Sequence, residues 1–115
     1  MIRRGGVWWV DFGVPRGFEP VVRRPAVVVS ANFLHRSRLR TATVAAITSN
    51  VRLAVRPGNV LVPEAVAGLE RESVVDVTQL LTVDEDELHQ RIGVLPTPLP
   101  KRVDDGLRLA LSLRW

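Results

Sequence analysis

The chain has 115 residues, a formal net charge of +4 and no cysteine. This length allows one domain with its own hydrophobic core, and the absence of cysteine excludes disulfides and thiolate metal sites. The two histidines, His35 and His89, lie far apart in the sequence, which argues against a histidine metal site. No apolar run approaches the ~20 residues of a membrane-spanning helix. We therefore predict a single cytoplasmic domain over residues 1–115, without metal or cofactor.

Charge is distributed unevenly along the chain. Residues 1–56 contain ten arginines and two acidic residues, a balance of +8, whereas residues 57–115 carry a balance of −4. Fifteen of the sixteen basic residues are arginine, whose guanidinium forms paired hydrogen bonds with phosphate. An arginine-rich genome would explain the arginine content, but it explains the concentration in one half less well. The asymmetry indicates a basic face and a polyanionic ligand.

The first half of the chain predicts three strands joined by loops. Residues 5–13 are aromatic and β-branched and end at glycine, which is typical of a strand. Residues 25–30 form a short continuous apolar run, as in a strand buried on both faces. Residues 43–50 indicate another short strand, which ends in hydroxyl side chains. The connections are a loop over 14–24, with prolines and a glycine, and an exposed basic segment over 31–42.

The second half predicts further strands before the chain becomes helical. Residues 51–63 read as two short strands around a turn at Pro57, Gly58 and Asn59. Residues 73–83 are rich in valine, threonine and leucine and predict one more strand.

Two helices are expected near the C-terminus. Asp84 and Glu87 have the spacing of a capping box, which predicts a helix beginning there. After an extended piece over 92–96, an amphipathic helix starts near Pro100. Its apolar stripe comprises Leu99, Val103, Leu107, Ala110 and Leu111. The fold class is therefore mainly β with helices: a curled, barrel-like antiparallel sheet with helices at one side.

The residues best placed for chemistry surround one strand end. Arg23 and Arg24 precede the apolar strand, Glu19 lies on the loop before them, and Thr48 and Ser49 end a neighbouring strand. If the two strands pair in an antiparallel manner, the end of the second lies near the start of the first. Thr48 would then lie close to Arg24.

An arginine, a carboxylate and a hydroxyl suit metal-free chemistry on RNA. A base such as Glu19 removes the proton of the ribose 2′-hydroxyl, which attacks the adjacent phosphate. The guanidinium stabilises the charge that develops on phosphorus, and Thr48 donates a hydrogen bond to a phosphate oxygen. DNA lacks the 2′-hydroxyl and cannot react in this way. From the residues alone, a simple anion-binding module explains the same set equally well.

The chain resembles the MazF/PemK (Kid) family of bacterial toxins, sequence-specific endoribonucleases that act as mRNA interferases. The resemblance rests on five short segments in the family's order and spans nearly the whole chain. They are "RRGGVWWVDFG", "PRGFEPVVRRPAVVVS", "VAAITSN", "LERESVVDVTQLLTVD" and "IGVLP", the last followed by the terminal helix.

This resemblance implies roles for individual residues. Arg24 matches the arginine before proline that the family needs for catalysis, Thr48 matches its partner threonine, and Glu19 matches the loop glutamate. Gln79 matches a glutamine near the active groove, where a structural role is equally compatible. Arg23 has no consistent counterpart and is expected to steer phosphate. We also expect Ser49, Arg16 and Arg36 to contact RNA.

Three positions depart from the family pattern. Phe18 replaces the usual serine, and its ring either anchors the loop or stacks on a base. Thr78 stands where many members have an acid, which would alter base recognition, and Gly6 replaces an acid at a strand start. None of these departures affects Arg24 or Thr48, so we expect activity to be retained.

The resemblance also implies a fold and partners. It implies an SH3-like barrel of the CcdB/Kid/MazF type, a homodimer, and single-stranded RNA bound in a groove that spans both subunits. The implied inhibitor is a MazE-like antitoxin whose disordered acidic tail occupies that groove. Two other functions remain compatible with the sequence: a CcdB-like toxin that binds DNA gyrase without nuclease activity, and a non-catalytic RNA-binding barrel.

Overall fold

A computed structural model of the chain describes residues 2–12 and 22–114. The strands are β1 (Gly6–Phe12), β2 (Val22–Val28), β3 (Thr41–Thr48), β4 (Val60–Val62), β5 (Ser73–Asp84) and β6 (Leu88–Val94). The helices are α1 (Asn32–His35) and α2 (Leu99–Leu111), and three short 3₁₀ segments are η1 (Val51–Val55), η2 (Val66–Gly68) and η3 (Glu85–Glu87). None of the helices in the described residues is both long and apolar enough to cross a membrane.

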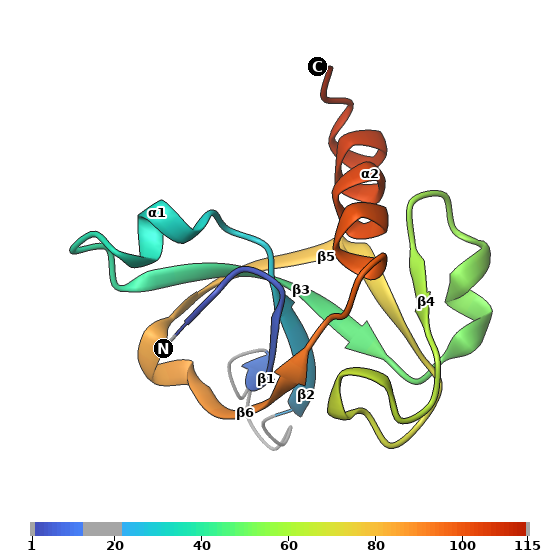
Figure 1. Ribbon diagram of the computed structural model, residues 1–115, viewed down its shortest axis with the longest axis horizontal. Helices are drawn as coiled ribbons and strands as arrows, with labels where there is room; N and C mark the ends of the chain where they lie inside the picture. The colour runs from blue at the N-terminus through green and yellow to red at the C-terminus, as the bar shows by residue number, and fades with distance from the viewer. Residues whose placement is uncertain (1, 13–21, 115) are drawn as a thin grey trace, which may run out of the picture.

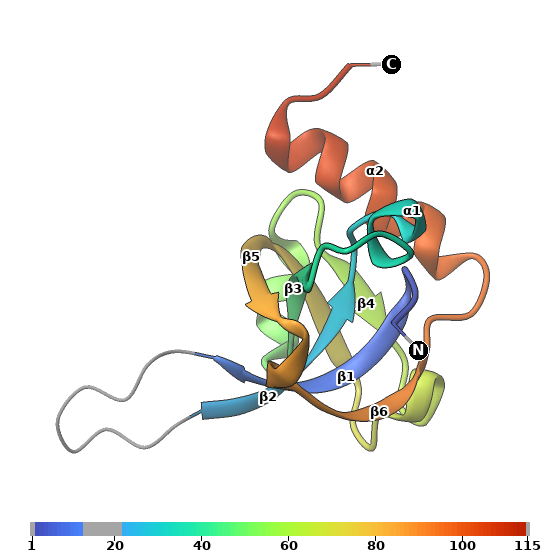
Figure 2. The same cartoon turned by 90° about the vertical axis from the view of Figure 1, so that its left-hand side faces the viewer.

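The six strands form one curled antiparallel sheet in the order β4-β5-β3-β2-β1-β6, with α2 packed across its end (Figure 1). Viewed from the side, β1 runs between β2 and β6, and α1 and α2 lie at the same end of the molecule (Figure 2). This arrangement confirms the predicted class, a mainly β, barrel-like sheet with a terminal helix.

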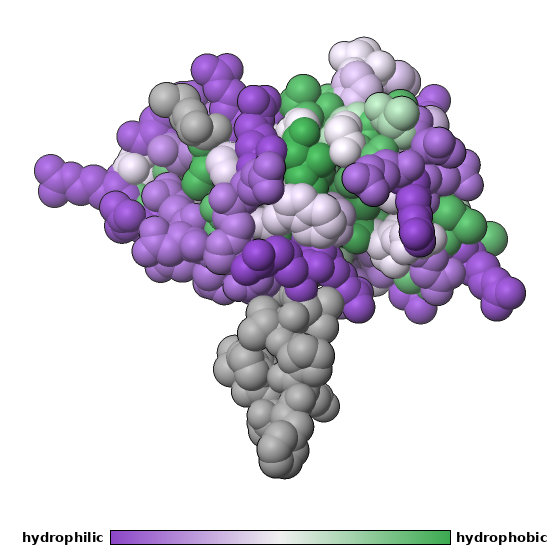
Figure 3. Space-filling view, turned by 90° about the horizontal axis from the view of Figure 1, so that it is seen from below, coloured by the Kyte–Doolittle hydropathy of each residue, from purple (hydrophilic) through white to green (hydrophobic). Residues whose placement is uncertain are grey.

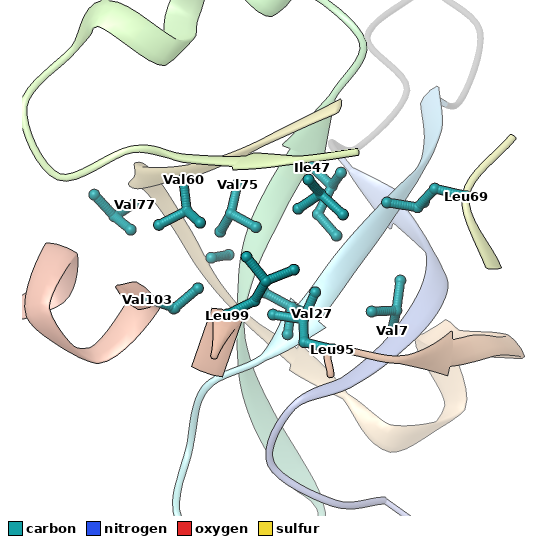
Figure 4. Close-up of a cluster of buried hydrophobic side chains, with 12 residues drawn as sticks. Val7, Val27, Ile47, Val60, Leu69, Val75, Val77, Leu95, Leu99 and Val103 are labelled. Carbon is teal, nitrogen blue, oxygen red and sulfur yellow. The ribbon is translucent and has the colours of Figure 1, made fainter. Parts of the chain in front are cut away.

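The hydrophobic core lies on both faces of the central strands. The larger cluster gathers side chains such as Val7, Val27, Ile47 and Val75 with Leu99 and Val103 of α2 (Figure 4). The second cluster contains Val10, Ala26, Val28, Val44, Val83 and Leu88. Successive residues of β2 therefore enter different clusters, which confirms that this apolar run is buried on both faces. A strand that packs on both faces has little freedom to move, so it fixes the position of the residues at its start.

β2 begins earlier than the sequence predicted. Arg23 and Arg24, assigned to a loop, are strand residues that pair with Asp11 and Val10 of β1. The ladder between β2 and β3 starts only after Pro25, at the pair Ala26 and Ala46. This boundary is consistent with proline, which has no backbone N–H to donate to a neighbouring strand.

Two other local predictions were wrong. Residues 51–55 are η1 rather than a strand, since the Asn50 side chain accepts a hydrogen bond from the Arg52 backbone N–H and starts a helical turn. The predicted helix at residue 84 is limited to the single turn of η3, although its capping box is present. The following residues form β6 because they pair with β1.

The remaining predictions hold with small changes. Of the segment 31–42, residues 31–40 are largely exposed and contain the short helix α1, whereas β3 already begins at Thr41. Of residues 92–96, the first three are the end of β6. In α2, Leu99 and Val103 are buried and Leu107 packs against the larger cluster. Ala110 and Leu111 are exposed, so the apolar stripe contacts the core only along the first part of the helix.

Candidate active site

The start of β2 and the end of β3 lie side by side. Their register pairs Ala26 with Ala46 and Val28 with Val44. When this antiparallel register is continued toward the start of β2, Arg24 falls opposite Thr48. The predicted pairing of these two strands is therefore confirmed, and it brings the two residues to the same end of the sheet.

A cavity of about 530 Å³ opens at this end. Its walls come from β1, β2, β3, β6 and the segment before β5, and the lining residues include Arg24, Pro25, Thr48 and Ser49. Viewed from below, the molecule presents hydrophilic side chains over much of its surface, with hydrophobic ones between them (Figure 3). The structure thus gathers three predicted site residues, Arg24, Thr48 and Ser49, around one space.

The two adjacent arginines have different environments. The Arg23 guanidinium donates from Nε to Asp11 Oδ1 at 3.0 Å. Arg24 is exposed and has no carboxylate partner among residues 2–12 and 22–114. A guanidinium without an internal carboxylate keeps its donors for an external anion. Arg24 is therefore the better placed of the two to bind phosphate.

Thr48 has a hydrogen-bonding pattern that suits a donor. Its Oγ1 accepts a hydrogen bond from the backbone N–H of Asn50 at 3.1 Å. A hydroxyl both donates and accepts, so this contact orients the oxygen and leaves its hydrogen for a ligand. The side chain is partly buried at the end of β3, which fixes its position beside the cavity.

Two predicted site residues within the described part of the chain, Arg36 and Gln79, do not line this cavity. Arg36 follows α1 and precedes the start of β3, whereas Thr48 ends that strand of eight residues, so roughly 25 Å of strand separates the two regions. Gln79 is exposed on β5, within an irregular stretch where the register with β3 shifts. Arg16, Phe18 and Glu19 lie outside the described residues.

The structure adds residues that the sequence analysis missed. Trp9 of β1 and the charged pair Glu70 and Arg71, just before β5, line the same cavity. The position of Trp9 could have been predicted from the sequence. Trp8 and Trp9 are consecutive residues of one strand, so their side chains point to opposite faces and one of them must face away from the main core. No sequence pattern indicated Glu70 and Arg71, because only the path of the chain from β4 to β5 brings them to this cavity.

A second polar contact lies beside the site. The Asp11 carboxylate accepts the Arg23 hydrogen bond and also contacts His89 Nε2 at 2.8 Å. Hydrogen bonding with His89 and then with Arg23 lowers the pKa of Asp11 from its ordinary value of 3.8. In the described part of the chain, no group of three or more His, Asp or Glu side chains is arranged to hold a metal ion.

Comparison with known proteins identifies the relatives of this chain. A family model described as the PemK-like, MazF-like toxin of type II toxin–antitoxin systems matches residues 3–111. The chain belongs to this family. Among its PemK/MazF relatives is endoribonuclease MazF6 of Mycobacterium tuberculosis, which is 42% identical over 113 residues, 98% of this chain and 99% of the relative. Endoribonuclease EndoA of Bacillus subtilis is 32% identical over 113 residues, 98% and 97% of the two chains.

Solved structures of toxins with the MazF fold superimpose on this chain. An endoribonuclease in complex with its cognate antitoxin from a mycobacterial species superimposes with a TM-score of 0.80. The alignment covers 100% of this chain and 99% of that one, at 22% identity. Mycobacterium tuberculosis toxin MazF-mt6 superimposes with a TM-score of 0.79 at 24% identity, over 96% of this chain and 99% of that one. The curled six-stranded sheet with its C-terminal helix is thus the fold of the MazF toxins.

Proposed function

We propose that this chain is the toxin of a type II toxin–antitoxin system and acts as a sequence-specific endoribonuclease on single-stranded RNA. The observation that carries the proposal is the meeting of Arg24 and Thr48 at one cavity, where neither side chain has an acidic partner within residues 2–12 and 22–114. The homologues named endoribonucleases, at 42% and 32% identity over nearly the whole chain, support it.

The proposed reaction is an attack of the 2′-hydroxyl on the adjacent phosphorus. A base, Glu19, takes the 2′ proton as the new oxygen–phosphorus bond forms. The bond from phosphorus to the 5′-oxygen then breaks, and that oxygen leaves as a hydroxyl after it takes up a proton. Arg24 stabilises the charge on the phosphate oxygens and Thr48 donates a hydrogen bond to one of them. The products are a 2′,3′-cyclic phosphate and a 5′-hydroxyl, and no step requires a metal.

The biological consequence would be cleavage of mRNA and inhibition of translation. A MazE-like antitoxin with a disordered acidic tail would neutralise the toxin, since an acidic peptide and RNA compete for the same basic surface. An endoribonuclease of the same fold has been solved in complex with its cognate antitoxin, which supports this partner. We further propose that the active form is a homodimer.

The alternative functions differ in their need for Arg24 and Thr48. A CcdB-like toxin that binds DNA gyrase requires no nuclease chemistry, and a non-catalytic RNA-binding barrel would bind RNA without breaking it. Only the nuclease requires a guanidinium and a hydroxyl at one reacting phosphate.

One experiment separates these functions. Purified protein is incubated with a long RNA in EDTA and the new ends are mapped. We expect discrete cleavage sites for the wild type, a loss of about 10²-fold or more in rate for Arg24→Ala, and a smaller loss for Thr48→Ala. Sedimentation velocity should show the same folded dimer for each protein. Intact RNA with the wild type, or equal cleavage by Arg24→Ala, would contradict the proposed function.

A further inference from the structure

A second cavity, of about 300 Å³, lies next to the candidate active site. It is lined by Trp9 of β1, Arg23 of β2, and His89 and Gln90 of β6. We call it the Trp9 cavity. Trp9 pairs with Gln90 across β1 and β6, and Arg23 pairs with Asp11 across β2 and β1, so three neighbouring strands build it.

One carboxylate holds two of the lining side chains in place. Asp11 Oδ1 accepts from Arg23 Nε at 3.0 Å, and Asp11 Oδ2 lies 2.8 Å from His89 Nε2. The Nε contact leaves the two terminal nitrogens of Arg23 without a carboxylate partner among the described residues. Trp9 is 37% exposed, so part of this aromatic residue faces solvent beside the cavity.

These side chains match the parts of a nucleotide. An indole face stacks on a base, a guanidinium binds phosphate, and a primary amide offers one donor and one acceptor to a base edge. Because Asp11 offsets the charge of Arg23, the Trp9 cavity carries less positive charge than an unpaired arginine would give it. This balance favours a stacked base over an acidic peptide, which would require an excess of positive charge.

The position of Trp9 connects the two cavities. Trp9 lines both of them, so they share one wall. β2 and β6 flank β1, which places them about 10 Å apart, and an RNA strand leaving Arg24 along the sheet would pass the indole next. We propose that the Trp9 cavity binds the nucleotide adjoining the scissile phosphate, with its base stacked on Trp9 and its edge contacted by Gln90. This inference rests on the proposed RNA cleavage.

The test measures binding separately from cleavage. A cleavage site is first mapped with the wild type, and a short RNA containing it is then made with 2′-deoxyribose at the attacking nucleotide, which blocks the reaction. We expect Trp9→Leu, which keeps an apolar side chain, to bind this RNA about ten-fold or more weakly. Trp9→Phe should stay within about three-fold of the wild type because it retains a ring. Phe33→Ala, an exposed aromatic on α1, is the matched control and should bind normally.

Each outcome has a distinct meaning. If the wild type cleaves RNA and Trp9→Leu binds as tightly as Trp9→Phe, the Trp9 cavity does not bind a base and only this inference fails. If the wild type neither binds nor cleaves RNA, the proposed function fails with it. If the Leu variant loses affinity for polyglutamate and not for RNA, the cavity receives an acidic protein segment, which also overturns the inference. Reduced base discrimination by Gln90→Ala at one position beside the cleaved bond would support it.

Discussion

At the residue scale, the adjacent arginines Arg23 and Arg24 differ in their contacts. Arg23 is bound by Asp11 and Arg24 has no such contact in the described residues. The resemblance to the MazF/PemK family implied that Arg24, the arginine before proline, is the functional residue. The sequence could not predict the bond from Arg23 to Asp11. That bond depends on the register of β1 and β2, which no local pattern specifies.

Asp11 gives this contact a measurable pH dependence. Hydrogen bonding with His89 and Arg23 lowers its pKa in the folded protein, so its charged form stabilises the fold at pH values above 3.8, and this contribution is lost as the pH falls through the lowered pKa. Asp11→Asn should therefore be less stable than the wild type near pH 6, by an amount that shrinks below about pH 4. Urea unfolding at both pH values measures the difference. A difference that does not change with pH would show that the charge of Asp11 is unimportant.

At the element scale, a local helix-start motif is present in the structure, yet the helix it predicted does not extend beyond one turn. The capping box of Asp84 and Glu87 is present, with Asp84 Oδ1 accepting from the Asp86 backbone N–H at 3.1 Å. The helix that this signal predicted still stops after one turn, because the next residues complete the sheet beside β1. Strand pairing between distant segments therefore outweighs a local helix start.

The long strand β5 contains a register irregularity that the sequence did not predict. Its register with β3 shifts between the pairs Ala45–Leu80 and Ala46–Asp76. Asp76, only 3% exposed, accepts hydrogen bonds from the backbone N–H and hydroxyl of Thr78 and lies 3.5 Å from Arg56. Asn59 Oδ1 accepts from the Val77 backbone N–H at 3.0 Å. These contacts satisfy backbone groups that the ladder leaves unpaired and so stabilise the irregular stretch.

Removal of the Asp76 carboxylate should destabilise the fold. Asp76→Ala leaves the Thr78 donors and Arg56 without their acceptor, and we expect a loss of about 2 kcal/mol in the free energy of unfolding. Asp76→Asn keeps an acceptor for Thr78 and should lose less. Asp86→Ala, at an exposed position, is the control and should change stability by less than about 0.5 kcal/mol. If the two alanine variants unfold at the same urea concentration, Asp76 does not stabilise this part of β5.

At the scale of the whole molecule, the sequence predicted the class of fold better than the extent of the site. Short strand-like segments and an amphipathic C-terminal helix were enough to predict a curled sheet, and the expected antiparallel pairing of β2 with β3 places Arg24 near Thr48. Glu70, Arg71 and Trp9 reach the same cavity only through the closure of the sheet and the path of its connections. Such contacts between distant segments leave no local pattern.

The most direct test of the proposed chemistry concerns the 2′-hydroxyl. Two short RNAs contain one mapped cleavage site and differ only in the nucleotide on the 5′ side of the cleaved bond, which carries ribose in one and 2′-deoxyribose in the other. We predict that the ribose substrate yields a 2′,3′-cyclic phosphate and a 5′-hydroxyl, and that the deoxyribose substrate stays intact at that bond while it still binds. Cleavage of the deoxyribose substrate at the same bond would contradict attack by the 2′-hydroxyl, because another nucleophile would then be required.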